Sequence, residues 1–200
     1  MILRSAPPSP FGRKCKLAVA ILGLADKIEM VKADTMDPQD SLRQQNPLGK
    51  IPILITDDGL ELYDSPVICE YLDGFAGGGK LFPDGEARWG ALRLQALGDG
   101  MMDAGLLQVY EARYRPEELH HQPWLDMQGE KVERGLAWLE ANTPKTGETP
   151  TIGDITLACA LGYLDFRFDG TWRKDHPKLV AWLDAFAKQV PAFAETRPDA

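Results

Sequence analysis

Several residue types are scarce in this chain of 200 residues, and each scarcity excludes a class of protein. The three cysteines, Cys15, Cys69 and Cys159, are too few and too far apart for a disulfide framework or for metal-ligand spacing. This usage predicts a reducing compartment. Basic residues are also in deficit, with 22 against 30 acidic residues and a net charge of −8. A negative surface repels phosphate backbones and anionic lipids, so neither nucleic acid nor a membrane is expected as a partner.

Long apolar runs are missing as well. No stretch approaches the roughly 20 apolar residues of a membrane span, and Pro7-Pro8 interrupts the start of the chain before a signal peptide could form. We therefore expect a cytoplasmic protein. With 44% hydrophobic and 26% charged residues, the composition is that of an ordinary globular protein. The length allows one or two domains, at roughly 100 to 200 residues per domain.

The first part of the chain changes its periodicity about every ten residues. Residues 1–4 and 28–32 read as strands, and the apolar positions between them, from Phe11 to Leu22, have helical spacing. A polar stretch at 34–46 has room for a turn or two of helix. The Asp58-Gly59 step between two apolar runs predicts a hairpin, and apolar spacing from Ile68 to Phe75 predicts another helix. The predicted order is βαβ, a variable segment, then ββα.

Strand signals vanish after Pro83, and the remaining apolar positions keep helical spacing. We place a boundary in the glycine-rich and proline-rich segment 77–83, which gives domains at 1–77 and 84–200. The first 80 residues carry a charge of −2 and the remainder −6. The N-terminal domain is therefore the less repulsive place for an anionic ligand.

Some motifs mimic functional sites. Residues 74–80 match a phosphate-binding loop as far as Lys80, but Leu81 stands where the loop needs Ser or Thr, and a helix precedes it. His120 and His121 are adjacent in a charged loop, and neighbouring histidines rarely face one ion, so no metal site is expected. No hydrolase nucleophile motif is present.

Three segments of the N-terminal domain are better candidates. In the first, Pro10 suits the first position of a helix and Ser9 its N-cap, where free N–H groups and the helix dipole stabilise an anion. By itself, this pattern is equally that of a simple capping serine.

The second candidate segment, 46–52, enters a strand through Pro52. A cis bond between Ile51 and Pro52 would turn the amide and carbonyl of Ile51 out of the sheet. An exposed strand edge beside Lys50 could then pair with the backbone of a peptide and with its carboxylate.

The third segment is a loop in which Asp64 is followed by Ser65, expected as the cap of a helix, and by Pro66 at its first position. Asp64 could hold an ammonium group, and Ser65 with its amide could hold a carboxylate. Two helix N-termini, one strand edge and one lysine would then face a single cleft.

These segments resemble the N-terminal signature of the cytosolic glutathione S-transferases, in particular small bacterial members with a Ser-Pro-Phe start. The Thr151-Ile152-Gly153-Asp154 segment is similar to the capping box of that family's C-terminal domain. The resemblance covers nearly the whole chain. It implies an α/β thioredoxin-like N-terminal domain followed by an all-α C-terminal domain, glutathione as co-substrate without a metal, and a homodimer.

The resemblance also assigns roles to individual residues. Ser9 would hydrogen-bond the glutathione sulfur, and Phe11 would line the sulfur pocket. The backbone of Ile51, exposed by cis Pro52, would meet the cysteinyl part. Lys50 would meet the glycyl carboxylate, and the γ-glutamyl end would be held by Asp64 and Ser65.

Serine at position 9, where other family members carry cysteine, argues against thiol-disulfide chemistry on the enzyme, and Cys15 reads as a core residue. A second substrate, a small hydrophobic electrophile, is expected against Met102, Leu106 and Tyr110, which equally suit a helix core or dimer interface. Asp103 could reach the glutathione ammonium group from a partner subunit.

The resemblance leaves several functions open. The first is a glutathione transferase. The alternatives are a glutathione-dependent reductase, isomerase or dehalogenase, and a non-catalytic glutathione-binding interaction module.

Overall fold

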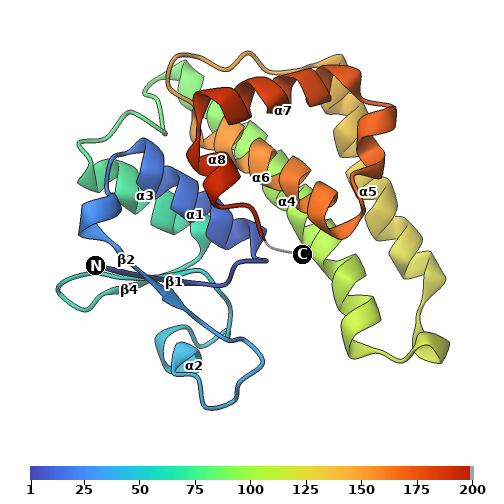
Figure 1. The fold of residues 1–200 in the computed structure, drawn as a ribbon, viewed down its shortest axis with the longest axis horizontal. Coiled ribbons are helices and arrows are strands. Elements are labelled where there is room, and N and C mark those ends of the chain that lie inside the picture. Colours follow the sequence, from blue (N-terminus) through green and yellow to red (C-terminus); the bar gives the residue numbers. More distant parts are fainter. Residues whose placement is uncertain (199–200) are drawn as a thin grey trace.

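A computed structural model describes residues 1–198. The N-terminal half alternates strands and helices in the order predicted from the sequence (Figure 1). Its elements are β1 (Ile2–Ser5), α1 (Pro10–Ile21), β2 (Glu29–Lys32), α2 (Leu42–Gln45), β3 (Ile53–Ile55), β4 (Glu61–Leu62) and α3 (Ser65–Phe75). The polar segment after β2 forms only the single turn of α2.

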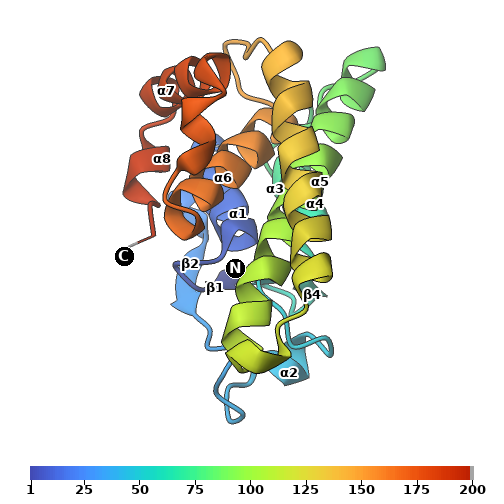
Figure 2. The same ribbon diagram turned by 90° about the vertical axis from the view of Figure 1, so that its right-hand side faces the viewer.

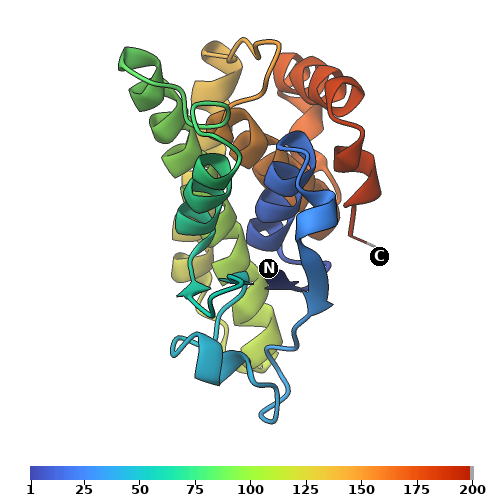
Figure 3. The same ribbon diagram turned by 90° about the vertical axis from the view of Figure 1, so that its left-hand side faces the viewer.

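The four strands form one mixed sheet in the order β2-β1-β3-β4. Strand β1 pairs with β2 in parallel, whereas β3 is antiparallel to both β1 and β4. Helices α1 and α3 pack against each other (Figure 3). Strand β3 pairs with β1 on one side and with β4 on the other, so the edge expected beside Lys50 does not run along β3. Ile51 and Pro52 precede the strand and lie outside its paired register.

The second half, as far as residue 198, is helical (Figure 2). Its α-helices are α4 (Glu86–Tyr114), α5 (Gln122–Ala141), α6 (Ile152–Arg167), α7 (Pro177–Gln189) and α8 (Ala192–Glu195). Helix α6 begins with the predicted capping box, in which Thr151 Oγ1 accepts from the Asp154 N–H while the Asp154 carboxylate accepts from the Thr151 N–H. Within residues 1–198, no helix combines the length and apolar character of a membrane span.

Helices α4 and α6 run side by side in the same direction, and they approach each other closely at two glycines of α4. A Cβ atom at Gly98 would lie 2.9 Å from the Thr156 side chain, and one at Gly105 would lie 3.3 Å from the ring of Tyr163. These two close approaches share one register, so the last turn of α6, which ends at Arg167, lies beside Val109 of α4, just over one turn before α4 ends.

The glycine-rich segment that resembles a phosphate loop encloses a carboxylate of the protein itself. Asp73, buried at the end of α3, accepts hydrogen bonds from the backbone N–H groups of Lys80, Leu81 and Phe82 at 3.2, 2.9 and 3.2 Å. The carbonyl of Leu81 in turn accepts from the N–H of Ile152 at 2.9 Å. The segment therefore fastens the end of α3 to the start of α6.

Candidate functional site

The register of the sheet brings the three predicted segments to one end of it. Arg4, near the end of β1, pairs with Ile53 at the start of β3, and Leu54 pairs with Leu62 at the end of β4. The loop that carries Ser9 follows β1, Ile51 and Pro52 precede β3, and Asp64 follows β4. Ser9, Ile51 and Asp64 are far apart in sequence, but their segments therefore lie at the same end of the sheet.

Ser9 is the N-cap of α1, and Pro10 follows at the first helical position, as predicted. Its oxygen accepts a hydrogen bond from the Gly12 N–H at 3.1 Å, and among residues 1–198 no group accepts the Ser9 hydroxyl proton. Gly12 is required here because a Cβ would overlap the Oγ of Ser5 on β1. A serine hydroxyl has one donor as well as its acceptor sites, so Ser9 can still donate to an anion.

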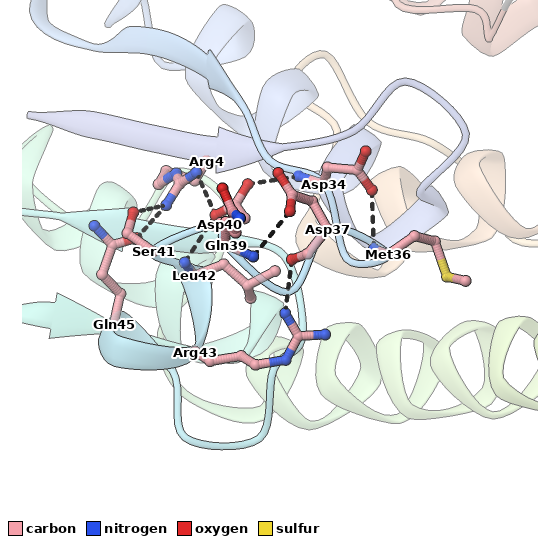
Figure 4. A network of polar contacts seen from close by, with 10 residues as sticks. All are labelled: Arg4, Asp34, Met36, Asp37, Gln39, Asp40, Ser41, Leu42, Arg43 and Gln45. Carbon is pink, nitrogen blue, oxygen red and sulfur yellow. Dashed lines mark hydrogen bonds and ion pairs between the residues drawn. The ribbon is translucent and has the colours of Figure 1, made fainter.

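Arg4 on β1 anchors the segment between β2 and β3 (Figure 4). Its guanidinium donates to the side chains of Asp40, Ser41 and Gln45 at 2.8, 2.8 and 2.6 Å. The N–H groups of Asp34 and Leu42, together with Arg4, hold the pKa of the Asp40 carboxyl below its usual value. The network fixes the start of the segment that continues into Lys50 and Ile51.

The turn before β3 is built around Asn46, whose side chain is buried. Its amide donates to the Lys50 carbonyl at 2.9 Å, and its carbonyl oxygen accepts from the Leu48 N–H at 3.0 Å. Gly49 takes a φ of 61°, which favours glycine. The peptide bond between Ile51 and Pro52 is cis, as expected. Lys50 is exposed, Ile51 is half-buried and Pro52 is buried.

The start of α3 differs by one residue from the expectation of a serine cap. Asp64 is the N-cap, Ser65 is the first helical residue and Pro66 follows it. Ser65 is 1% exposed, and its Oγ has no hydrogen-bond partner among the described residues. An unpartnered buried hydroxyl at a helix N-terminus is suited to receive an anionic group.

Charged groups from both halves of the chain face this end of the sheet. Burial raises the pKa of the Asp103 carboxyl on α4, the charge of Lys50 works against that rise, and Asp64 adds to it. These three side chains are therefore within electrostatic reach of one another. Asp99, one turn earlier on α4, forms an ion pair with Lys14 of α1.

The residues predicted for the second substrate lie on one stripe of α4. Met102 is 1% exposed and belongs to the core, whereas Leu106 and Tyr110 are half-buried. Phe11 is also half-buried and packs against the core.

Two functional candidates were not singled out from the sequence. Tyr163 on α6 lines a cavity of about 10 Å³ together with Ser9 and Arg13. Arg13 is buried and donates to the carbonyl of Phe193, whose ring it covers at 3.9 Å. For Tyr163, the sequence offered one signal. Cys159, Tyr163 and Arg167 recur at every fourth residue, a spacing that places them on one face of a helix.

All three thiols are fully buried. Burial raises the pKa of Cys15 well above its ordinary value and that of Cys159 to about 12. The prediction that Cys15 is a core residue is confirmed.

Comparisons with known proteins agree with this arrangement. Models of the glutathione S-transferase N-terminal and C-terminal domains match residues 8–74 and 122–185. The uncharacterized GST-like protein YibF of Escherichia coli (strain K12) is 36% identical over 197 residues, which cover 95% of each chain. A thioredoxin-like domain followed by an all-helical domain thus defines the class. The chain belongs to the glutathione S-transferase family.

Two solved relatives carry ligands. A glutathione transferase family member from Pseudomonas fluorescens Pf-5 with bound glutathione is 42% identical, with a TM-score of 0.89 over 100% of this chain and 99% of its own. The same relative has been solved with S-(propanoic acid)-glutathione. A glutathione S-transferase from Methylobacillus flagellatus with glutathione bound is 35% identical, with a TM-score of 0.91 over 99% of both chains.

Proposed function

We propose that this protein is a glutathione transferase that binds glutathione and activates its thiol for attack on a small electrophile. The observation that carries the proposal is the convergence of Ser9, with its unused hydroxyl proton, and Ser65, with its unpartnered Oγ, at one end of the sheet. Relatives with bound glutathione, at 35% and 42% identity over essentially the whole chain, support it.

Each part of glutathione has a complementary group in this proposal. The thiolate accepts from Ser9 beside Phe11, and the cysteinyl backbone pairs with Ile51, which Pro52 leaves unpaired. The glycyl carboxylate meets Lys50. The γ-glutamyl carboxylate meets Ser65 and the α3 N-terminus, and Asp64 and Asp103 attract the γ-glutamyl ammonium group.

The site is sufficient to ionise a thiol near neutral pH. A free thiol has a pKa of about 8.5, and each unit of lowering needs about 1.4 kcal/mol. A hydrogen bond to a charged sulfur contributes roughly 1.5–3 kcal/mol, and a helix N-terminus adds about 0.3–1 kcal/mol. Together they lower the thiol pKa by one to two units, which makes much of the bound thiol a thiolate.

Ser9→Ala tests the role of the hydroxyl. We expect turnover of a chlorodinitrobenzene-type electrophile at saturating glutathione to fall by about tenfold or more, since one charge-assisted hydrogen bond is lost, while glutathione affinity changes much less. Ser9→Thr, which keeps a hydroxyl and an N-cap oxygen, is the matched control and should retain more activity. Unchanged turnover in Ser9→Ala would remove Ser9 from the mechanism.

The same assays separate the alternatives. Binding to immobilised glutathione without activity on an aryl halide, a peroxide or a mixed disulfide would favour an interaction module. Reduction of a mixed disulfide alone would favour a reductase, which the buried thiols of this chain argue against. Absence of glutathione binding would overturn every form of the proposal.

A homodimer and a cytoplasmic location remain part of the proposal on the strength of the family. Light scattering at several protein concentrations tests the first. Cell fractionation tests the second.

A further inference from the structure

The C-terminal part of α4 and the end of α6 carry two tyrosines and two arginines near the site. We call Tyr110, Arg113, Tyr163 and Arg167 the arginine–tyrosine cluster. The Arg113 guanidinium lies 5.6 Å from the ring centre of Tyr110. Burial raises the pKa of the Tyr163 phenol, and the charges of Arg167 and Arg113 work against that rise. A Cβ atom at Gly105 would lie 3.3 Å from the ring of Tyr163, so Tyr163 packs against the same half of α4 that carries Tyr110 and Arg113.

This cluster continues directly from Ser9. Tyr163 lines the small cavity that Ser9 also lines, so the two residues lie close together. Arg167 is one helical turn further along α6, which corresponds to about 6 Å. On α4, Arg113 follows Leu106 and Tyr110 on the same stripe, the one predicted for the second substrate.

The positive charges of the cluster are not neutralised by the protein. Among residues 1–198, neither Arg113 nor Arg167 forms an ion pair, and the Nε of Arg167 is shielded from solvent without a hydrogen-bond partner. The nearby carboxylates are engaged elsewhere: Asp165 with Arg173 and Glu111 with Arg115. The Arg167 guanidinium lies over the ring of Phe166 at 4.1 Å, which fixes its plane.

We infer that the second substrate of this enzyme is an electrophile that carries a carboxylate, held by Arg167 with Arg113 and the two tyrosine hydroxyls around it. The two terminal NH₂ groups of a planar guanidinium match a carboxylate in two parallel hydrogen bonds. Neutral phenols add donors without adding a competing negative charge. The inference rests on the proposed function and replaces its neutral hydrophobic electrophile by an anionic one.

Both arginines also lie in the last turn of their helices, where a positive charge favours the helix dipole. That structural role predicts a change in stability when an arginine is replaced. It predicts no discrimination between an anionic and a neutral ligand, so ligand charge separates the two roles.

Equilibrium binding of two matched conjugates tests the inference without requiring turnover. The probes are S-(4-carboxybenzyl)glutathione and its carboxamide, which have nearly the same shape but differ by one charge. We expect the wild type to bind the carboxylate at least tenfold more tightly, Arg167→Gln to remove this preference with carboxamide affinity retained, and Arg167→Lys to keep part of it. Arg134→Gln, on the exposed face of α5, is the control and should keep the full preference.

Equal binding of the two conjugates by a wild-type protein that binds glutathione would overturn the inference and leave the proposed function standing. So would an equal loss of affinity for both conjugates in a folded Arg167→Gln variant. Arg113→Gln gives a second, independent variant should Arg167→Gln fail to fold. If wild type binds neither glutathione nor either conjugate, the proposed function and the inference both fail.

Discussion

The ammonium group of Lys14 lies 2.6 and 2.9 Å from the two carboxylate oxygens of Asp99. The Lys14 side chain is fully buried, and that of Asp99 is 18% exposed. Burial is the strongest single influence and works against the ammonium charge, but the charge and hydrogen bond of Asp99, together with the neighbouring Cys69 and Cys15, raise the pKa of Lys14 on balance. Since Lys14 belongs to α1 and Asp99 to α4, this ion pair joins the two halves of the chain beneath the site.

Replacement of one partner of this pair should be more harmful than replacement of both. Asp99→Ala leaves a buried ammonium group without a counter-charge, which we expect to lower the free energy of unfolding by about 3 kcal/mol. The double variant Lys14→Met, Asp99→Leu should lose less. Urea unfolding measures both, and Glu130→Ala, which breaks the exposed pair with Arg134, should cost about 1 kcal/mol or less. A double variant as unstable as Asp99→Ala would contradict this account.

The pair also predicts how stability depends on pH. The pKa of Lys14 in the folded protein lies above its ordinary value of 10.5, so folding favours the protonated form. Its contribution is therefore fully present below pH 10.5 and is lost as the pH rises through the higher folded value. From neutral pH upward, the difference in unfolding free energy between wild type and the double variant should stay constant until it shrinks in strong alkali. A loss that begins near neutral pH would show that the ammonium group is not held in this way.

Replacement of Asp73 should lower the stability of the fold around the linker 77–83 and should not affect catalysis. Asp73→Asn replaces one carboxylate oxygen by an NH₂ group that cannot accept from a backbone N–H, so we expect a loss of about 1–3 kcal/mol. Urea unfolding together with limited proteolysis of residues 77–83 measures it. Asp84→Asn, at an exposed position of the same linker, is the matched control. Equal stability of the two variants would contradict the assigned role.

The thiols should be unreactive in the folded protein. Because the thiolate is the reactive form and burial raises the pKa of Cys15 and Cys159, iodoacetamide at mildly alkaline pH should modify none of the three cysteines before unfolding. Mass spectrometry should find three modifications in guanidinium. Cys15→Ala should keep its turnover. Stoichiometric modification of a native thiol with loss of activity would contradict the proposal that the reactive sulfur belongs to glutathione.

Local signals in the sequence were sufficient for most of the fold. Ser9 with Pro10, the Asp58-Gly59 hairpin and the capping box from Thr151 to Asp154 each act within a few residues. These contacts form between residues only a few positions apart, so they could be predicted without knowing how the rest of the chain folds.

Positions that depend on strand order could not be read in this way. The edge expected beside Lys50 does not run along β3, because the pairing of this strand with both β1 and β4 is decided by the whole sheet. The placement of Met102 in the core was likewise decided by packing of α4 against its neighbours.

The sequence alone established that the chain has too few cysteines, too far apart, for a disulfide framework, and that its basic residues are outnumbered by acidic ones. The tertiary structure alone decided which charged side chains lie close together. Lys14 meets Asp99 across 85 positions, and the ring of Tyr163 packs against α4 only because Gly105 leaves room for it. Electrostatic and packing energies depend on distance in space, and no local pattern in the sequence encodes that distance.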